Sequence, residues 1–389
     1  MRILLANLTK MVDDTGGLAK VTCSFANAML KYGHEVFLVY SDEREGNFFF
    51  KIDDKVHIYD LRHFNGQSIN FPLALKLKRE IFRVVDDRRA RTVNDDFAEK
   101  YLKENLMAII DEVKPEVIIA FQPASSKLLL CDLNVNIPVI TMSHGDPEDY
   151  FHTYPLKELP ALEKSAVCQV LLPSFAENLK RHLPNLNTIV IGNAVPQYEQ
   201  SAKLGAKKDN YIVITIGRLV KNHKRPHLLI EAFRSIAEKF PNWQLEIWGA
   251  KDKKVYYREL ENIIKKANLQ DRIFLKGVTN DVESVLKRGD LFVFPSAYEG
   301  FGLSLAEAMS MGLPSIGYKS CVAINELITD SVNGFLCEDG IEPLANKMAE
   351  LMRDQQLRCK MGQAARDSMR RYSPDNIWNQ WNNLIESFK

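Results

Sequence analysis

The stretch of sequence that decides the fold is FPSAYEGFGLSLAEAMSMGLP, which runs from Phe294 to Pro314. The apolar run Leu291–Phe294 predicts a buried strand that ends at Pro295. A loop with two glycines follows, and the good helix formers that begin at Leu303 predict a helix. This succession of strand, loop and helix is the unit from which parallel α/β sheets are built.

The same alternation of short apolar runs and helical stretches extends along the whole chain, which predicts parallel sheets with crossover helices. In the first half we expect strands at Arg2–Ala6, His34–Tyr40, Val117–Phe121, Pro138–Met142 and Cys168–Leu172, and helices at Gly17–Lys31 and Asp96–Val113. In the second half we expect strands at Tyr211–Ile216, Gln244–Trp248, Arg272–Leu275, Leu291–Phe294 and Pro314–Gly317. Helices are expected there at Pro226–Lys239, Tyr256–Ala267, Asp281–Lys287, Leu303–Ser310 and Pro343–Arg353, followed by closing helices at Asp354–Arg371 and Pro374–Phe388.

The pattern restarts after the polar stretch Gln197–Asn210, whose Gly, Lys and Ser content is typical of a linker. We therefore predict two Rossmann-like α/β domains, residues 1–195 and 196–371, with a last helix over 372–389 that packs back on the first domain. In such an architecture the carboxyl ends of the strands of both domains face a central cleft, where ligands bind.

Composition excludes several classes of function. Lys and Arg number 51 against 50 Asp and Glu, so the net charge does not predict a nucleic-acid partner. No apolar run reaches the roughly 18 residues of a membrane span, and MRILLANLTK predicts a first strand rather than a secretory signal. The six cysteines show no CxxC spacing, which favours reduced core thiols in a cytoplasmic protein. No motif predicts a metal site or a bound cofactor.

The loop and helix after Pro295 carry the clearest chemistry. The backbone amides from Gly300 to Leu303 stand at a predicted helix N-terminus, where free N–H groups and the helix dipole attract anions such as phosphate. Glu299 precedes them and Glu307 follows, and an ionised carboxylate only accepts hydrogen bonds. A sugar nucleotide has hydroxyl groups on both sides of its phosphates. Taken singly, Glu299 is better explained as a solvated loop residue and Glu307 as a partner of the helix dipole.

The segment Glu299-x7-Glu307, with the tail Ala308 to Pro314, resembles the signature of the retaining GT-B enzymes of glycosyltransferase family 4. The segment Ile216–Lys224 resembles the phosphate-binding Gly-Arg-Leu…Lys segment of that family, and it places Arg218 beside the donor phosphates. Lys221 and Lys224 compete for the lysine position, and we favour Lys224. Arg and Lys suit a pyrophosphate because Arg donates in a fork and Lys acts as a point charge. Without the resemblance, both are as well explained by a solvated basic loop.

Three segments of the first half also resemble the family. Asp14-Thr-Gly16-Gly17 resembles its Gly-Gly loop, in which backbone amides approach the donor phosphates. Thr141–Asp146 resembles the segment with the active-site histidine, here His144. Ile191–Pro196 resembles the interdomain segment, although Gly192 and Ala194 depart from its pattern.

The resemblance implies a retaining glycosyltransferase that needs no metal and uses a nucleoside-diphosphate sugar, for which we expect UDP, with GDP as the alternative. The residues that it places in catalysis are Glu299, His144, Arg218 and Lys224. Those that it places on the donor are Gly16, Gly17, Gly217, Val278, Gly300, Phe301, Gly302, Leu303 and Glu307. The acceptor that it implies is a saccharide or a lipid-linked saccharide of a surface polysaccharide.

The stretch Lys76–Arg91 holds seven basic and three acidic residues, a local net charge of +4, with apolar residues interleaved. One interpretation is peripheral docking on anionic lipid at the inner face of the cell membrane. The other is an ordinary surface helix of the first domain.

Two other functions remain open. A sugar-nucleotide epimerase on the same scaffold would need no acceptor, and Glu299 with Glu307 argues against it. A non-catalytic GT-B subunit that only recognises an acceptor is expected to lose the donor-site residues, which are present here. A nicotinamide dehydrogenase fits poorly because the first strand–helix turn lacks GxGxxG, and no segment marks the Schiff-base lysine of a phosphorylase.

Overall fold

The computed structural model describes residues 1–389, and these divide into two α/β units. Unit 1 comprises Met1–Asn193 with Ile377–Lys389, and unit 2 comprises Ala194–Asn376. The first crossing between the units lies two residues before the predicted boundary at 195/196. The chain returns to unit 1 between Asn376 and Ile377, five residues after the predicted boundary at 371/372. Tyr372 therefore still belongs to unit 2. There its carbonyl accepts a hydrogen bond from the N–H of Val195, 2.8 Å away.

Unit 1 is built on a parallel sheet of seven strands in the order β3-β2-β1-β4-β5-β6-β7. The strands are β1 Arg2–Asn7, β2 Glu35–Tyr40, β3 His57–Asp60, β4 Val117–Ala120, β5 Val139–Met142, β6 Val167–Val170 and β7 Thr188–Val190. The helices are α1 Gly17–Lys31, α2 Leu73–Val85, α3 Asp87–Tyr101, α4 Lys103–Val113, α5 Pro123–Lys127, α6 Glu148–His152, α7 Leu159–Lys164, α8 Pro173–His182 and, after unit 2, α15 Pro374–Glu386.

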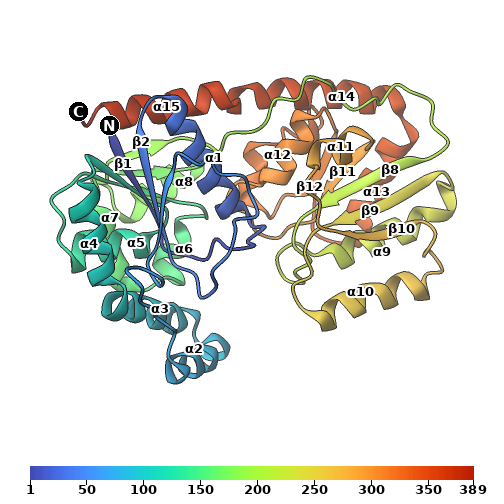
Figure 1. Ribbon diagram of the computed structural model, residues 1–389. Coiled ribbons are helices and arrows are strands. Elements are labelled where there is room, and N and C mark those ends of the chain that lie inside the picture. The colour runs from blue at the N-terminus through green and yellow to red at the C-terminus, as the bar shows by residue number, and fades with distance from the viewer. The chain divides into compact units, whose positions relative to one another are not determined.

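Unit 2 has a parallel sheet of six strands in the order β10-β9-β8-β11-β12-β13. The strands are β8 Tyr211–Ile216, β9 Trp243–Trp248, β10 Ile273–Gly277, β11 Leu291–Phe294, β12 Ser315–Tyr318 and β13 Gly334–Cys337. The helices are α9 Pro226–Ile236, α10 Lys254–Lys266, α11 Val282–Lys287, α12 Leu303–Ser310, α13 Ile341–Arg353 and α14 Gln355–Ser368. Helices cover both faces of the sheet in each unit (Figure 1), so the predicted fold of two Rossmann-like units is confirmed.

Each sheet reverses its strand order at one point. In unit 1 the reversal lies between β1 and β4, and in unit 2 it lies between β8 and β11. In open parallel sheets, ligands bind beyond the carboxyl ends of the strands at such a switch point, because the connections leave it in opposite directions. The predicted phosphate loop after β8 and the loop with Glu299 after β11 therefore meet at the switch point of unit 2.

Three strands that the sequence did not predict, β3, β7 and β13, all lie at sheet edges. β3 and β7 have no buried residue, so they lack the continuous apolar run that marks a central strand. The helix predicted over Asp96–Val113 is also wrong in part, because the chain forms two helices that meet at Leu102. Leu102 is buried in the core of unit 1, and the apolar periodicity continues on both sides of it.

The closing helix α15 belongs to unit 1 from Ile377 onward and packs on α1. The ring of Trp381 lies edge-on to the ring of Phe25 with centroids 4.9 Å apart, and the hydroxyl of Tyr32 donates to Asn379 over 2.7 Å. All six cysteines are free, and four of them are buried. None of the helices has the length and apolar character that crossing a bilayer requires.

The turn after β9 passes so close to the end of β8 that only glycine fits at position 249. Gly249 has φ +146°, and a Cβ atom there would lie 1.9 Å from the carbonyl oxygen of Gly217. Its N–H donates to the carbonyl of Gly277 over 2.7 Å, and the N–H of Gly217 donates to the carbonyl of Trp248 over 2.9 Å. This close packing fixes the start of the loop that follows β8.

We expect Gly249→Ala to lower the free energy of unfolding by about 2 kcal/mol or more, because the new methyl group collides with backbone and the positive φ is strained. Gly277→Ala is the matched control, since Gly277 has φ +78° but no atom within 4 Å of the added Cβ. Its expected cost is about 1 kcal/mol. Chemical denaturation of both variants measures the difference, and equal losses would contradict the steric account.

Candidate functional site

The loop after β8 forms one wall of the candidate site in unit 2. It folds back on itself, since the N–H groups of Lys224 and Arg225 donate to the carbonyl of Val220 over 3.2 and 3.1 Å. Arg225 then takes the left-handed conformation at φ 45°, and Pro226 opens α9. The turn brings Lys224 back toward the end of β8, where its side chain lies 3.4 Å from the position of a Cβ on Gly217.

The loop after β11 forms the second wall and is bonded to the first. The N–H of Ala297 donates to the carbonyl of His223 over 2.7 Å, and Nε of Arg225 donates to the carbonyl of Pro295 over 2.9 Å. The helix that follows is bonded to the end of β8, because the hydroxyl of Ser304 donates to the carbonyl of Ile216 over 2.8 Å. The two loops therefore hold their side chains in a fixed relation.

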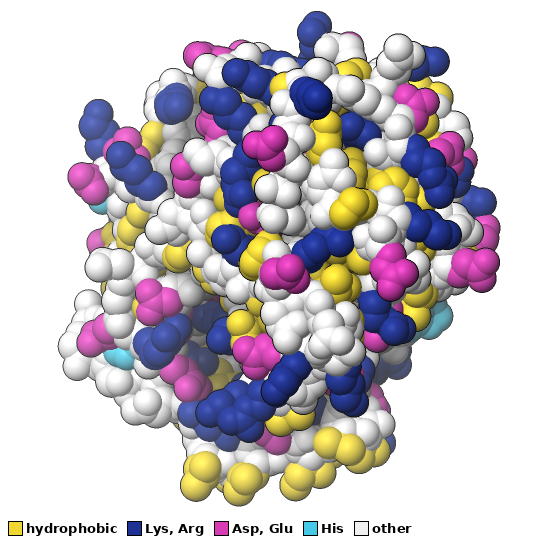
Figure 2. All heavy atoms as spheres, turned by 90° about the vertical axis from the view of Figure 1, so that its right-hand side faces the viewer, with side chains coloured by type: hydrophobic (Ala, Val, Ile, Leu, Met, Phe, Trp, Pro, Cys, Tyr) yellow, Lys and Arg dark blue, Asp and Glu magenta, His cyan; other side chains and the backbone are white.

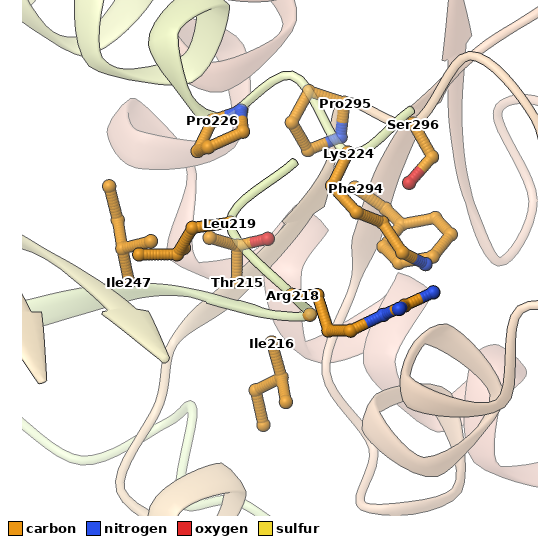
Figure 3. Close-up of a pocket in the computed structure, with 11 residues that line it drawn as sticks. Thr215, Ile216, Arg218, Leu219, Lys224, Pro226, Ile247, Phe294, Pro295 and Ser296 are labelled. Carbon is orange, nitrogen blue, oxygen red and sulfur yellow. The ribbon is translucent and has the colours of Figure 1, made fainter. Parts of the chain in front are cut away.

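A pocket with about 240 Å³ of empty space, open solvent included, lies between these walls (Figure 3). Both predicted cations, Arg218 and Lys224, line it, and Figure 3 shows that their side chains extend from the same loop. The remaining lining residues are Thr215, Ile216, Gly217, Leu219, Pro226, Ile247, Phe294, Pro295 and Ser296.

Lys224 forms an ion pair with Glu299, and the Glu299 side chain is only 11% exposed. The ammonium also lies 4.9 Å from the centroid of the Phe294 ring, where the negative face of the ring favours a cation. Lys221, the competing lysine, instead pairs with Glu259 at 2.7 Å and does not line the pocket. The structure thus places Lys224 and not Lys221 beside Glu299.

Arg218 is the unpaired cation of the pocket. Its side chain is exposed, and it forms no hydrogen bond or ion pair. A guanidinium with five free N–H donors is suited to bind an oxyanion in two-point contact. One wall of the pocket therefore carries an unsatisfied positive charge.

The N-terminus of α12 adds backbone donors to this unit. Gly302 caps the helix at φ 85°, a conformation that glycine adopts without strain. The first N–H groups of a helix have no partner inside it, so those that follow Gly302 are available to an anion. Glu307 is 3% exposed within the same helix. The ends of β8 and β11 therefore bring together two cations, a helix N-terminus and the carboxylate of Glu299, with Glu307 buried further along α12.

Some predicted donor residues lie elsewhere in unit 2. Phe301 is buried, and its ring contacts Tyr372 edge-on with centroids 5.1 Å apart, so its side chain supports α12 rather than lining the pocket. Val278 is exposed beyond the end of β10 and does not line the pocket. Gly300, Leu303 and Glu307 are also outside the lining, whereas Gly217 is part of it.

Ser296 is a residue of the pocket that the sequence analysis did not identify. It is fully buried, and its hydroxyl has no hydrogen-bond partner. A buried hydroxyl without a partner is costly, so this atom is a ready contact for a bound ligand. The only signal in the sequence is its place directly after the strand end at Pro295.

In unit 1, His144 follows β5 and stacks on Phe121 at the end of β4, with ring centroids 5.6 Å apart. Burial lowers the pKa of His144 to about 4, so the imidazole is neutral near pH 7. Its Nε2 atom is buried and has no hydrogen-bond partner. A ring nitrogen of a neutral imidazole can donate or accept one hydrogen bond with a ligand without adding charge.

The glycines predicted for the donor in unit 1, Gly16 and Gly17, stand at the start of α1. Gly16 caps the helix, and its N–H donates to the carboxylate of Asp14 over 3.0 Å. The preceding loop is held by Asp42, whose carboxylate accepts from the N–H groups of Met11 and Val12, each over 2.9 Å. A Cβ on Gly16 would lie 3.1 Å from the Asp14 carboxylate.

Comparisons with known proteins show which domain unit 2 is similar to. Residues 196–368 match the family described as glycosyl transferases group 1. An uncharacterized glycosyltransferase of Haemophilus influenzae is 24% identical over 377 residues, which cover 96% of this chain and 97% of that protein. Poly(glycerol-phosphate) alpha-glucosyltransferase of Bacillus subtilis is 30% identical over 190 residues, 48% of this chain, and the match covers 28% of that relative's length.

Among solved structures, a TarM variant of S. aureus in complex with fondaparinux, alpha-GlcNAc-glycerol and UDP is similar over 99% of both chains, with a TM-score of 0.78 and 19% identity. At this identity the likeness shows the shared two-unit fold, which is the GT-B architecture. Together, the matched domain and the shared fold support a glycosyltransferase.

The pocket predicts that inorganic pyrophosphate binds unit 2 through Lys224. We expect Lys224→Ala to weaken this binding by roughly tenfold or more, since a charge-assisted hydrogen bond is lost. Lys221→Ala is the matched control, three residues away on the same loop, and it should bind like the wild type. Calorimetric titration measures both, with unfolding midpoints recorded to show that the variants fold. A larger loss for Lys221→Ala would contradict the assignment.

His144 predicts a dependence of stability on pH. The pKa is lower in the folded protein than the ordinary value of 6.5, so on acidification the unfolded chain takes up the proton first. The stability of the wild type should therefore fall between pH 6.5 and pH 4, by up to about 3 kcal/mol from this group. Denaturation of wild type and His144→Gln across this range should show a smaller fall for the variant. Parallel curves would mean that His144 titrates normally.

Proposed function

We propose that this chain, whose unit 2 matches glycosyl transferases group 1, is a retaining glycosyltransferase that takes a sugar from a nucleoside-diphosphate donor. The acceptor in this proposal is a saccharide, free or lipid-linked, of a surface polysaccharide.

The single observation that carries the donor class is the pair of cations at one pocket, Arg218 without a partner and Lys224 paired with Glu299. Two positive charges and the N-terminus of α12 match the negative charges of a diphosphate. When the sugar leaves, negative charge grows on the departing diphosphate, and fixed positive groups stabilise it most at that moment. These residues supply that charge themselves, so the proposed reaction needs no metal ion and no cofactor.

The carboxylates are assigned to the two ends of the donor. Glu299 is proposed to accept hydrogen bonds from hydroxyls of the transferred sugar, because it stands beside Lys224 at the phosphate pocket. Glu307, buried within α12, is proposed for the ribose hydroxyls. His144 is proposed to contact the transferred sugar as a neutral hydrogen-bonding group, in line with its low pKa.

In the proposed reaction the bond between the anomeric carbon and the diphosphate oxygen breaks, and its electron pair stays on the diphosphate. The acceptor hydroxyl forms the new bond to the anomeric carbon on the same face, which retains the configuration. Its proton passes to the departing phosphate oxygen. The diphosphate thus acts as the base, so the chain has only to stabilise its charge and hold the sugar.

The preferred donor is a UDP-sugar. Support comes from the S. aureus TarM variant of the same fold, whose structure includes UDP. Support for a polymeric acceptor comes from the B. subtilis relative, an alpha-glucosyltransferase of poly(glycerol-phosphate). A non-catalytic subunit and an epimerase are the competing functions. A non-catalytic subunit forms no product, and an epimerase alters the donor sugar when no acceptor is present.

The proposal predicts that Glu299→Gln keeps donor binding and loses transfer. We expect nucleotide affinity within about threefold of wild type, because Lys224 stays in place and loses only its ion-pair partner. Transfer should fall roughly 10- to 100-fold, the usual effect of losing hydrogen bonds to a charged group. The measurement is sugar transfer from a UDP-sugar to saccharide acceptors, with EDTA present, and with the anomeric configuration of the product determined by NMR.

Glu338→Gln is the matched control, because Glu338 is an exposed carboxylate of unit 2 that pairs with Lys319 at 3.0 Å. It should transfer like the wild type. Equal turnover in the Glu299 variant would remove the role proposed for that carboxylate. An inverted product would overturn the retaining mechanism, and dependence on an added divalent ion would overturn the metal-free one.

A further inference from the structure

Helix α2 of unit 1 presents an uncovered apolar row. Five large apolar side chains in the whole chain are more than 60% exposed, and four of them are in this helix, namely Leu73 at 72%, Ile81 at 64%, Val84 at 88% and Val85 at 76%. Leu77 lies between them and is 59% exposed. No residue of α2 is buried. Single exposed apolar residues are common on proteins, but a contiguous row marks an interaction site.

The helical spacing gathers this row on one side of α2. At about 100° per residue, Leu73, Leu77, Ile81, Val84 and Val85 occupy an arc of about 120°. The inward side is different, since Leu75 and Phe82 pack against the core of unit 1. The helix is also held in place by Arg79, which lies over the ring of Phe71 at 4.8 Å and donates to Asn94 over 3.2 Å. The apolar row is therefore a fixed outward face of an anchored helix.

Basic side chains border the row. Lys78 lies on one side of it, and Lys76 and Arg83 lie on the other, by the same spacing. Figure 2 shows the hydrophobic side chains along the lower edge of the molecule with Lys and Arg directly above them. Helix α2 itself holds four basic residues and Glu80, a net charge of +3, which becomes +2 when Glu43, the ion-pair partner of Lys76, is included. Arg83 pairs with Glu80 at 3.0 Å within the helix.

This charge decides between two partners for the row. In a dimer formed through α2, the twofold symmetry would place the same basic stretch of each copy opposite the other. Burial of the row between two copies would bring their basic residues within a Debye length of each other, where like charges repel. An anionic bilayer offers an apolar interior for the row and negative headgroups for the basic border.

We infer that α2 docks this protein on anionic lipid bilayers, with the apolar row in the acyl region and Lys76, Lys78 and Arg83 at the headgroups. The helix then lies in the plane of the interface and does not cross the bilayer, since it has 13 residues. This inference is independent of the proposed reaction, because docking requires no donor and no acceptor.

The test is sedimentation of the full chain with vesicles of phosphatidylcholine alone and of phosphatidylcholine mixed with phosphatidylglycerol, without any nucleotide. The wild type should bind the mixed vesicles, bind the neutral ones weakly, and release at high salt. Leu77→Ser/Ile81→Ser should abolish binding. Lys78→Gln/Arg83→Gln should weaken it roughly 10- to 30-fold, since each basic residue contributes about 1 kcal/mol near an anionic surface.

Matched controls lie on α10 of unit 2. Val255 is 79% exposed and stands alone, and Lys265 and Lys266 are exposed without an apolar row beside them. Val255→Ser and Lys265→Gln/Lys266→Gln should bind vesicles like the wild type. Because every substituted side chain is outside the core, unfolding midpoints should stay unchanged in all four variants.

Three results would overturn the inference. One is a wild type that binds neither vesicle, and another is binding that survives both α2 variants. The third is a dimer, seen by light scattering of the free protein, that Leu77→Ser/Ile81→Ser dissociates while no vesicle binds. That result would assign the row to a second copy of the chain.

Discussion

The candidate site depends on the hydrogen bonds that join the loop after β8 to the loop after β11. The N–H of Ala297 donates to His223, and the guanidinium of Arg225 donates to Pro295. The strands β8 and β11 are neighbours, so their carboxyl ends already lie together, and the loop-to-loop bonds fix the side chains beyond them. They hold Lys224 against Glu299 in a partly buried ion pair, which long side chains on separate mobile loops would not maintain.

At the pocket of unit 2, one cation is paired with a carboxylate and the other has no partner. Lys224 is paired with Glu299, whereas Arg218 has no partner and the first amides of α12 face no intrahelical acceptor. In the proposed function, an entering diphosphate adds the negative charge that Arg218 and the helix N-terminus lack. The hydroxyl of Ser296, buried without a partner, points to the same conclusion. The proposed function therefore uses positive groups that are already in place, which is how a site stabilises charge without reorganising.

Much of this arrangement could be predicted from sequence. The bounds of β8, β11 and α12 match the prediction because buried central strands and a well-bounded helix leave continuous patterns. The edge strands β3 and β7 were missed because half-exposed strands lack such patterns. The sequence favoured Lys224 over Lys221, and the turn at Val220 supplies the physical reason, because it brings the ammonium of Lys224 to Glu299. Ser296 could not be found from sequence, because an unsatisfied buried hydroxyl is a property of the packed loop.

The most direct test of the central claim, that unit 2 is built to bind a nucleoside diphosphate, is a calorimetric titration of the full chain with UDP, UMP and uridine. We expect UDP to bind at least about tenfold more tightly than UMP, and uridine to bind weakest, because each phosphate adds charge-assisted hydrogen bonds. Equal affinity for all three compounds would show that the nucleoside alone is recognised. No binding of UDP, with GDP and ADP equally inactive, would contradict the claim itself.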